Sequence, residues 1–218
     1  VSNGNDLSDK RYTIVHDYNG VYVRKMCRHC VNPACVSVCP VGALYKTKEG
    51  AVLYDASKCI GCRYCMVACP FRIPRYEWGS AVSPRVRKCI LCYELVKNGQ
   101  QTACAEVCPT EATRFGEREE LIRYAHSSIQ KEPKKYINYV YGENEVGGTS
   151  VLYLSNIPFN KLGIDYGFRS DVPHDPLPEY TWKVLSEIPY EVGILSVLLV
   201  GIWWITSRRD EVRKAEGK

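Results

Sequence analysis

The sequence predicts an α+β protein with a repeated cysteine-bearing domain, a C-terminal extension and one transmembrane helix. Three observations lead to this prediction. All 12 cysteines fall in three groups, which begin at Cys27, Cys59 and Cys89, at steps of 32 and 30 residues. Each group closes on Cys-Pro and precedes a short hydrophobic segment, as expected for an internal repeat. Near the C-terminus, residues 192–206 form an uncharged apolar run.

Each repeat unit is predicted to pass from a strand through a cysteine loop into a short helix. Alternating apolar and polar residues around a turn at 48–50 indicate a hairpin over 43–55. The Cys-x3-Cys pairs suit a helical turn, because residues four apart share one face. Acidic residues followed by an apolar row indicate a surface helix over 116–129, and residues 149–157 read as a strand.

The second cysteine group carries the most specific spacing. It reads Cys59-x2-Cys62-x2-Cys65-x3-Cys69-Pro, which is the bacterial ferredoxin run for a 4Fe-4S cluster. Three thiolates within seven residues surround one cluster, whereas the fourth faces away and ligates the neighbouring cluster. The domain is therefore expected to be ferredoxin-like.

The first group follows the same plan with two extra residues, and an exchange of last cysteines between the groups gives two ligand sets. The third group has a gap of 11 residues and is expected to bind a third cluster. The predicted iron ligands are Cys27, Cys30, Cys35 and Cys69 for one 4Fe-4S cluster, Cys59, Cys62, Cys65 and Cys39 for the second, and Cys89, Cys92, Cys104 and Cys108 for the third.

Zinc is the main alternative to iron-sulfur clusters, because Cys-x2-Cys pairs also make tetrahedral zinc sites. Zinc explains the third group tolerably and the second badly, since a tetrahedral site has no use for a Cys-x2-Cys-x2-Cys run. A disulfide scaffold fits worse, because the cysteines cluster within residues 27–108. His29 lies inside the first group and is expected to pack beside a cluster, because four cysteines are already present there.

The net charge of +5 does not indicate nucleic-acid binding. Residues 24–118 hold fifteen Lys or Arg against seven Asp or Glu, but no basic-aromatic stripe or helix-turn-helix pattern accompanies them. Thiolate-bound clusters are anionic, so these basic residues are expected to offset them. The sequence also lacks a P-loop, a dinucleotide-binding glycine pattern and a nucleophile elbow. Its predicted chemistry is electron transfer without a catalytic site.

The apolar run near the C-terminus predicts a membrane anchor. Ile188–Ser207 provides 20 residues, which matches the roughly 20 needed to cross a bilayer. Trp203 and Trp204 lie near one end, and Arg208 with Arg209 ends the run. The alternative is a buried core helix. Because the tail is basic and the preceding residues are acidic, the positive-inside rule predicts a cytoplasmic C-terminus and a periplasmic main domain.

Five parts are therefore expected along the chain. These are a polar N-terminal segment (1–20), the ferredoxin-like iron-sulfur domain (21–118), an extension with a proline-rich linker (119–187), the transmembrane anchor (188–207) and a basic cytoplasmic tail (208–218).

The chain resembles the iron-sulfur subunits that link redox enzymes to membrane quinone. It is most similar to the membrane-anchored ferredoxin-like subunit of periplasmic uptake nickel-iron hydrogenases, the hydrogenase-2 type. The runs that carry this resemblance are VNPACVSVCPVGAL, CIGCRYCMVACPFRIPRYEW, KCILC, CAEVCP, FGEREEL and YGENEVGGTSVLYLSNIPFNKL, with the single C-terminal span.

The resemblance implies the partners and the route. Electrons from hydrogen oxidation would pass from the small and large hydrogenase subunits through this chain to an integral membrane quinone-reacting subunit, with the anchor in membrane lipid and no nucleic acid involved. Export by a twin-arginine signal is also implied. Two alternatives stay open: an iron-sulfur subunit of a formate dehydrogenase or other molybdenum oxidoreductase, and a zinc-stabilised membrane interaction protein.

The chain departs from this family in one respect. The family has four cysteine groups and four clusters, and the outer groups exchange ligands as the inner two do. Cys89, Cys92 and Cys104 would then need a cysteine upstream of Val1, and Cys108 would serve a cluster whose other ligands also lie upstream. The chain begins with valine, so we expect a processed protein or a fragment whose first group, and with it a fourth cluster, lies outside this sequence.

Overall fold

The computed structural model describes residues 6–80 and 84–217. It divides into a compact body, residues 1–178, and a C-terminal unit, residues 179–218. The two units are described in turn.

The body is built on three antiparallel two-stranded sheets. The first is a hairpin that turns at Asn19-Gly20, where both residues have a positive φ (51° and 82°). Asn-Gly is the preferred pair for such a two-residue turn. The described strands pair as β1 (Thr13–Tyr18) with β2 (Val21–Met26), β3 (Leu44–Lys46) with β4 (Val52–Tyr54), and β5 (Arg75–Tyr76) with β6 (Val86–Arg87).

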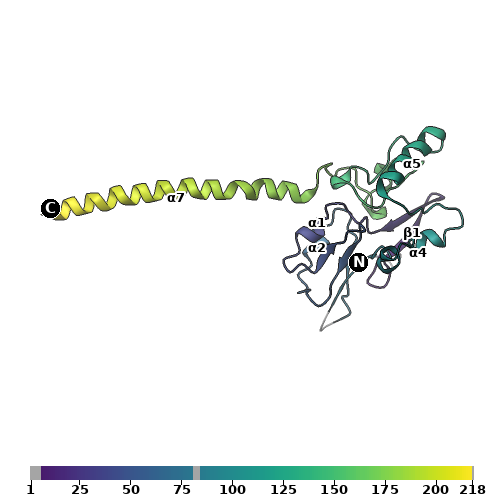
Figure 1. Cartoon of the computed structure of the whole chain (residues 1–218), viewed down its shortest axis with the longest axis horizontal. Coiled ribbons are helices and arrows are strands. Elements are labelled where there is room, and N and C mark those ends of the chain that lie inside the picture. Colours follow the sequence, from purple (N-terminus) through teal and green to yellow (C-terminus); the bar gives the residue numbers. More distant parts are fainter. Residues whose placement is uncertain (1–5, 81–83, 218) are drawn as a thin grey trace. The chain divides into compact units, whose positions relative to one another are not determined.

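The hairpin predicted over 43–55 is confirmed, because β3 and β4 form it. The short helices predicted at the Cys-x3-Cys pairs are also present, and α1 and α2 lie side by side (Figure 1). They are single turns because the following Cys-Pro pair ends each of them. The helices of the cysteine domain are α1 (Ala34–Ser37), α2 (Tyr64–Ala68), α3 (Tyr93–Lys97) and α4 (Ala103–Glu106).

The predicted surface helix is confirmed as α5 (Arg118–Lys131), which buries Ala125 and Ile129 on one face. The strand expected over 149–157 is wrong. This segment makes only isolated bridges, Cys30 with Thr149 and Tyr141 with Tyr153. It changes partner after a few residues, so no continuous ladder forms. The remaining short helices of the body are η1 (Glu145–Gly147), α6 (Phe159–Leu162) and η2 (Ile164–Tyr166).

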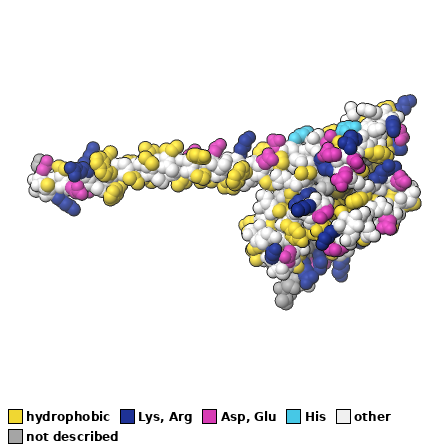
Figure 2. Space-filling view, in the orientation of Figure 1, with side chains coloured by type: hydrophobic (Ala, Val, Ile, Leu, Met, Phe, Trp, Pro, Cys, Tyr) yellow, Lys and Arg dark blue, Asp and Glu magenta, His cyan; other side chains and the backbone are white. Residues whose placement is uncertain are grey.

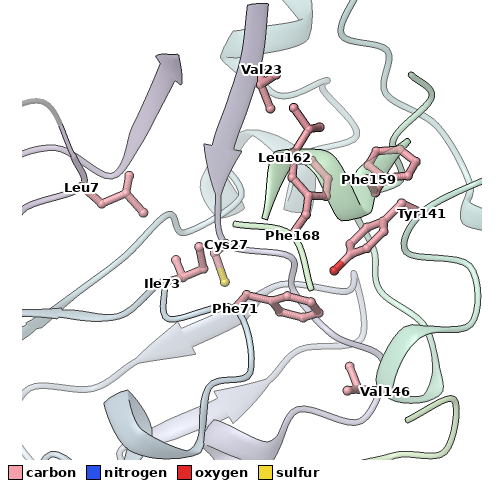
Figure 3. Close-up of a cluster of buried hydrophobic side chains, with 10 residues drawn as sticks. All are labelled: Leu7, Val23, Cys27, Phe71, Ile73, Tyr141, Val146, Phe159, Leu162 and Phe168. Carbon is pink, nitrogen blue, oxygen red and sulfur yellow. The ribbon is translucent and has the colours of Figure 1, made fainter. Parts of the chain in front are cut away.

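The main core joins the cysteine loops to this post-cysteine segment. Tyr141 lies 4.9 Å from Phe159 and 4.9 Å from Phe168, measured between ring centroids. Figure 3 shows these rings on one side of the cluster, with the sulfur of Cys27 near Phe71 on the other. The aromatic rings of the extension therefore pack against the first cysteine group and fix its position.

The N-terminal residues also belong to this body. Leu7 is buried in the main core, and β1 pairs along its whole length with β2. Asp6 holds Lys25 and Arg75, with its oxygens 2.9 Å from the nitrogen of each. The described residues before position 20 thus pack on the cysteine domain, although their composition suggested a separate polar segment.

The C-terminal unit belongs to one long helix, α7 (Leu177–Ala215), which is long and apolar enough to cross a membrane. None of its residues is buried, and Figure 2 shows hydrophobic side chains along its length and charged ones gathered near its C-terminus. The helix begins before the predicted start at 188, because a proline is tolerated in a first turn and Pro178 occupies that place. The extended linker therefore ends at residue 176.

Candidate iron-sulfur cluster sites

The three Cys-x2-Cys turns share one backbone geometry. The third residue of each turn, His29, Gly61 or Leu91, is left-handed, with φ of 48°, 72° and 58°. This bend brings the Gly61 amide nitrogen to 3.4 Å from Cys59 Sγ and the Leu91 amide nitrogen to 3.4 Å from Cys89 Sγ. Amide hydrogens directed at a sulfur stabilise the thiolate form, which is the metal-binding form.

The three Cys-Pro turns are also alike. The third residue after the cysteine is left-handed in each, namely Gly42, Arg72 and Glu111, with φ of 61°, 51° and 51°. In the first of these turns, the Ala43 amide donates to Cys39 Sγ at 3.2 Å. Arg72 and Glu111 occupy a conformation that costs a non-glycine residue about 1 kcal/mol or more. Such strain persists only where the surroundings hold the turn in place.

One set of four cysteines converges beside the main core. Burial raises the pKa of the Cys30 thiol, and the charges of Cys27, Cys69 and Cys35 raise it further. Burial and the same neighbours, Cys27 and Cys69, raise the pKa of Cys35 to about 12. Cys27, Cys30 and Cys69 also pack on one hydrophobic cluster. The structure thus brings the last cysteine of the second group to three cysteines of the first.

A second set of four cysteines lines one pocket, and Cys35 packs against the same small hydrophobic cluster as Cys39 and Cys65 of this set. Burial and the charges of Cys59, Cys62 and Cys39 raise the pKa of Cys65 to about 11. Cys62 is solvent-exposed, so this pocket opens to the surface. The pocket is lined by Cys39, Cys59, Cys62, Cys65, Val41, Ala43, Leu44, Tyr54, Ile60, Arg63 and Val86.

The third group is more open, and its cysteines have different neighbours. Burial raises the pKa of Cys89 to about 11, with Cys27 and Cys92 among the charges acting on it. Thr102 and Arg24 lower the pKa of Cys104 against the effect of burial. Hydrogen bonds from the Thr113 amide and neighbouring groups lower the pKa of Cys108. The groups that lower these two pKa values most are therefore threonines, an arginine and backbone amides rather than other cysteines.

The first set has neighbours in each of the other two regions. Cys65 of the second set is among the charges that act on Cys35 of the first. Likewise, Cys27 of the first set is the foremost charge acting on Cys89 of the third group. The first set therefore lies close to both of the others.

Buried cations surround the first set. The ammonium of Lys88 is buried, and its nitrogen donates to the carbonyl oxygens of Val52 and Cys89. Arg28 is also buried, and its guanidinium carbon lies 3.9 Å from the ring centroid of Tyr153. Buried charges are costly unless compensated. Anionic clusters on the converging thiolates would supply that compensation, so the residues present fit iron-sulfur groups.

The sequence predicted that basic residues within 24–118 offset the clusters, but it did not single out Arg28, Lys88 or Lys46. Arg28 lies inside the first Cys-x2-Cys turn and Lys88 directly precedes Cys89, so their places beside cysteines were the only signal. Nothing in the sequence marked Lys46, which lies in the hairpin strand β3. Its nitrogen donates hydrogen bonds to the carbonyl oxygens of His29 and Cys30, both at 2.9 Å.

A single metal ion is a poorer fit to the described part of the chain. All 12 cysteines are free thiols. Within residues 6–80 and 84–217, no three His, Cys, Asp or Glu side chains are grouped as they would be around one ion. The zinc alternative therefore gains no support from the geometry.

Comparison with known proteins agrees with the cluster sites. Residues 18–118 match the family model of the 4Fe-4S dicluster domain. A protein of Nitratidesulfovibrio vulgaris is 41% identical over 211 residues, which is 94% of this chain and 56% of the relative. The hydrogenase-2 operon protein HybA of Escherichia coli O157:H7 is 41% identical over 169 residues, 66% of this chain and 51% of the relative.

A third relative belongs to a formate dehydrogenase, the alternative that the sequence left open. The iron-sulfur subunit of the nitrate-inducible formate dehydrogenase of Escherichia coli K12 is 38% identical over 160 residues, 68% of this chain and 53% of the relative. The chain spans about half the length of the curated relatives it matches. Over residues 18–118 the chain therefore carries a 4Fe-4S dicluster domain, and beyond that domain it is similar to the iron-sulfur subunit of a formate dehydrogenase and to a hydrogenase-2 operon protein.

Proposed function

We propose that this chain relays single electrons between a periplasmic nickel-iron hydrogenase and a membrane subunit that reacts with quinone. The observation that carries the proposal is the convergence of three cysteines from one group with the last cysteine of the other. Iron-sulfur clusters held there would supply one-electron chemistry.

The ligand sets we propose are the two that converge. Cys69 completes the set begun by the first group, and Cys39 completes the set begun by the second. The protein holds the thiolates in place through the left-handed turns, and it directs amide hydrogens at the sulfurs. Buried Lys88 and Arg28 supply positive charge, and they donate hydrogen bonds to backbone carbonyl oxygens of Val52, Cys89 and Gly167.

The proposed electron route connects the three regions. Electrons would pass between the third group and the second set through the first set, which lies close to both. Cys62 is exposed in the second set, at one end of the proposed route, and Cys92 belongs to the third group, at the other end. The surface around each end would then face a different redox partner.

For the third group we propose a cluster on Cys89, Cys92 and Cys104, completed by a ligand that the chain as given does not contain. Cys108 would serve a further cluster with upstream ligands. This proposal is supported by the threonines, the arginine and the backbone amides that act on Cys104 and Cys108.

Iron and acid-labile sulfide per chain, with EPR spectra of the reduced protein, test these assignments. Twelve irons per chain would mean three complete clusters, and eight would mean that the third group is empty. Sixteen would require the upstream group. A preparation that contains zinc and no sulfide would contradict the proposal and leave the zinc-stabilised interaction protein.

A formate dehydrogenase or related molybdenum enzyme is the second candidate partner. The formate dehydrogenase subunit is similar over 68% of this chain, slightly more than the 66% for HybA. Purification of the native complex decides between them. Nickel that copurifies with the chain supports the hydrogenase, whereas molybdenum supports the alternative.

We also propose that α7 anchors the chain in membrane lipid, with the body in the periplasm and the basic tail in the cytoplasm. The support is the apolar length of the helix and the basic residues that follow it. Carbonate extraction of membranes would leave an anchored chain in the pellet and release a peripheral one.

A further inference from the structure

His29 is a completely buried histidine with one ring nitrogen in use and one free. The backbone amide of Val52 donates a hydrogen bond to Nδ1 of His29, with 2.9 Å between the two nitrogens. The other nitrogen, Nε2, is also buried and has no hydrogen-bond partner in the described protein. The exposed fraction of the residue is 0%, so water does not reach it.

The hydrogen bond from Val52 fixes which nitrogen carries the proton. An imidazole nitrogen that accepts a hydrogen bond has no hydrogen of its own, so the ring hydrogen lies on Nε2. Nε2 is therefore a donor. A buried donor without an acceptor is unfavourable, and the site supplies none from the described protein.

The ring cannot turn away to find another partner. His29 has a left-handed backbone, with φ of 48°. Its carbonyl oxygen accepts from Lys46 Nζ at 2.9 Å and from the Ser150 amide at 3.3 Å. These two bonds hold the backbone of the turn in place, and the hydrogen bond from Val52 holds the imidazole ring.

His29 lies inside the first Cys-x2-Cys turn, between the predicted ligands Cys27 and Cys30. Cys27, Cys30 and Cys69 all pack on the hydrophobic cluster beside this turn. The buried donor of His29 therefore belongs to the surroundings of the sulfurs at the first set of cysteines.

We propose that Nε2–H of His29 donates a hydrogen bond to a sulfur of the cluster held by Cys27, Cys30, Cys35 and Cys69, and thereby raises the reduction potential of that cluster. A hydrogen bond to sulfur favours the more negative, reduced state, so the bond strengthens when one electron is added. His29 is a positioning residue in this scheme: it is no ligand and transfers no proton. The inference rests on the proposed function, because it requires the cluster.

Two substitutions test the roles of the two ring nitrogens of His29 separately. In His29→Asn, the side-chain oxygen lies near the position of Nδ1 and preserves the acceptor for Val52, but the chain is too short to donate from the position of Nε2. In His29→Gln, the amide nitrogen reaches that position and preserves the donor. His126→Gln is the matched control, because His126 lies on α5 and pairs with Glu143.

Redox titration of the full-length holoprotein, followed by EPR, provides the test. We expect His29→Asn to move one cluster potential to a more negative value, while His29→Gln and His126→Gln stay close to wild type. If His29→Gln shifts and His29→Asn does not, the ring only supports Val52 and the inference is wrong. Equal potentials in all four proteins, with iron and sulfide at wild-type levels, also overturn it.

A second measurement detects the donated proton itself. The reduced cluster of wild-type protein assembled in H2O should show the hyperfine coupling of a strongly coupled exchangeable proton, which is lost after assembly in D2O and absent in His29→Asn. A wild-type spectrum without that proton coupling contradicts the inference even if the variants fail to assemble. A wild-type chain without iron and sulfide would instead contradict the proposed function itself.

Discussion

The guanidinium carbon of Arg28 lies 3.9 Å from the ring centroid of Tyr153, directly behind the first Cys-x2-Cys turn. The same carbon is 4.4 Å from the ring centroid of Phe168. Nη2 of Arg28 donates a hydrogen bond to the Gly167 carbonyl oxygen at 2.9 Å. A planar cation therefore stands between aromatic rings of the extension and links them to the cysteine loop.

Replacing this cation with lysine should destabilise the body. Arg28→Lys keeps the charge but loses the flat surface that stacks on the rings. At a desolvated site this loss should lower the free energy of unfolding by about 2–3 kcal/mol. For a body of this size, the thermal midpoint should fall by roughly 5–10 °C. The control is Arg114→Lys, because Arg114 stacks on Tyr124 at 4.5 Å but is partly exposed. That change should cost less than about 1 kcal/mol. Equal effects of both changes would contradict a special role for the buried stack.

The exchange of cysteines between groups predicts which cluster each substitution damages. Cys69→Ser should alter the same EPR signal as Cys27→Ser, although Cys69 belongs to the second group in sequence. Cys39→Ser should alter the same signal as Cys62→Ser, because Cys39 and Cys62 line one pocket. Redox titrations of the four variants measure this. If Cys39→Ser and Cys27→Ser affect the same signal, each group closes its own cluster.

Gly142 is predicted to be essential for the loop that supports Cys30. A side-chain carbon at Gly142 would lie 2.6 Å from the Val151 carbonyl oxygen and 2.5 Å from Thr149 Oγ1, at a φ of 99°. Gly142→Ala should lower the free energy of unfolding by more than about 3 kcal/mol, because the backbone strain at this φ and the steric overlap of the added carbon add together. Since Thr149 bridges Cys30, iron content should fall with stability.

Gly20→Ala is the matched control for this substitution. Gly20 also has a positive φ, 82°, but nothing lies within 4 Å of an added carbon. It should cost only about 1–2 kcal/mol from backbone strain and leave iron content unchanged. A similar loss of iron in both variants would mean that backbone strain alone, and not the contact with Thr149, explains the effect.

Ionised Asp6 is expected to make a pH-dependent contribution to the free energy of unfolding. Burial opposes ionisation of Asp6, but the hydrogen bond from Lys25 and the charge of Arg75 outweigh it and lower the pKa below the ordinary 3.8. A lowered folded-state pKa stabilises the protein above the unfolded pKa, and this contribution is lost as the pH falls through the folded value. The difference in unfolding midpoint between wild type and Asp6→Asn should be constant from about pH 8 to pH 5 and shrink below about pH 4. Cluster loss in acid affects both proteins, so the difference isolates Asp6.

The apolar-polar alternation around residues 48–50 was sufficient to predict the hairpin, and the Cys-x3-Cys spacing was sufficient to predict the single-turn helices. The cluster ligand sets stay a prediction. The information in both patterns is local or repeated, because each turn depends on a few residues of fixed spacing. Gly61 supplies a left-handed residue in the second turn, yet His29 and Leu91 adopt the same φ without being glycine. The geometry therefore depends on the cysteine positions and the surrounding contacts more than on glycine.

The supporting residues could not be predicted in the same way. Arg28 contacts Tyr153 and Phe168 across more than 120 positions of sequence, and no periodic pattern marks such a pair. The segment after residue 149 has the apolar alternation of a strand, but its partner changes from Cys30 to Tyr141. Long-range packing, which local propensity does not encode, decided both outcomes.

The orientation of α7 provides the last prediction. Basic residues on the cytoplasmic side of a span set its direction, and Arg208, Arg209, Arg213 and Lys214 all follow the apolar run. A fluorescent protein fused after Lys218 should therefore mature in the cytoplasm, whereas alkaline phosphatase at the same place should stay inactive. Replacing the four basic residues with glutamine should weaken this preference and raise phosphatase activity. The control replaces Lys134 and Lys135, which follow α5 in the body, and should change neither reporter. Active phosphatase after the unaltered tail would place that tail in the periplasm, and the proposed electron route to the membrane would then need the opposite topology.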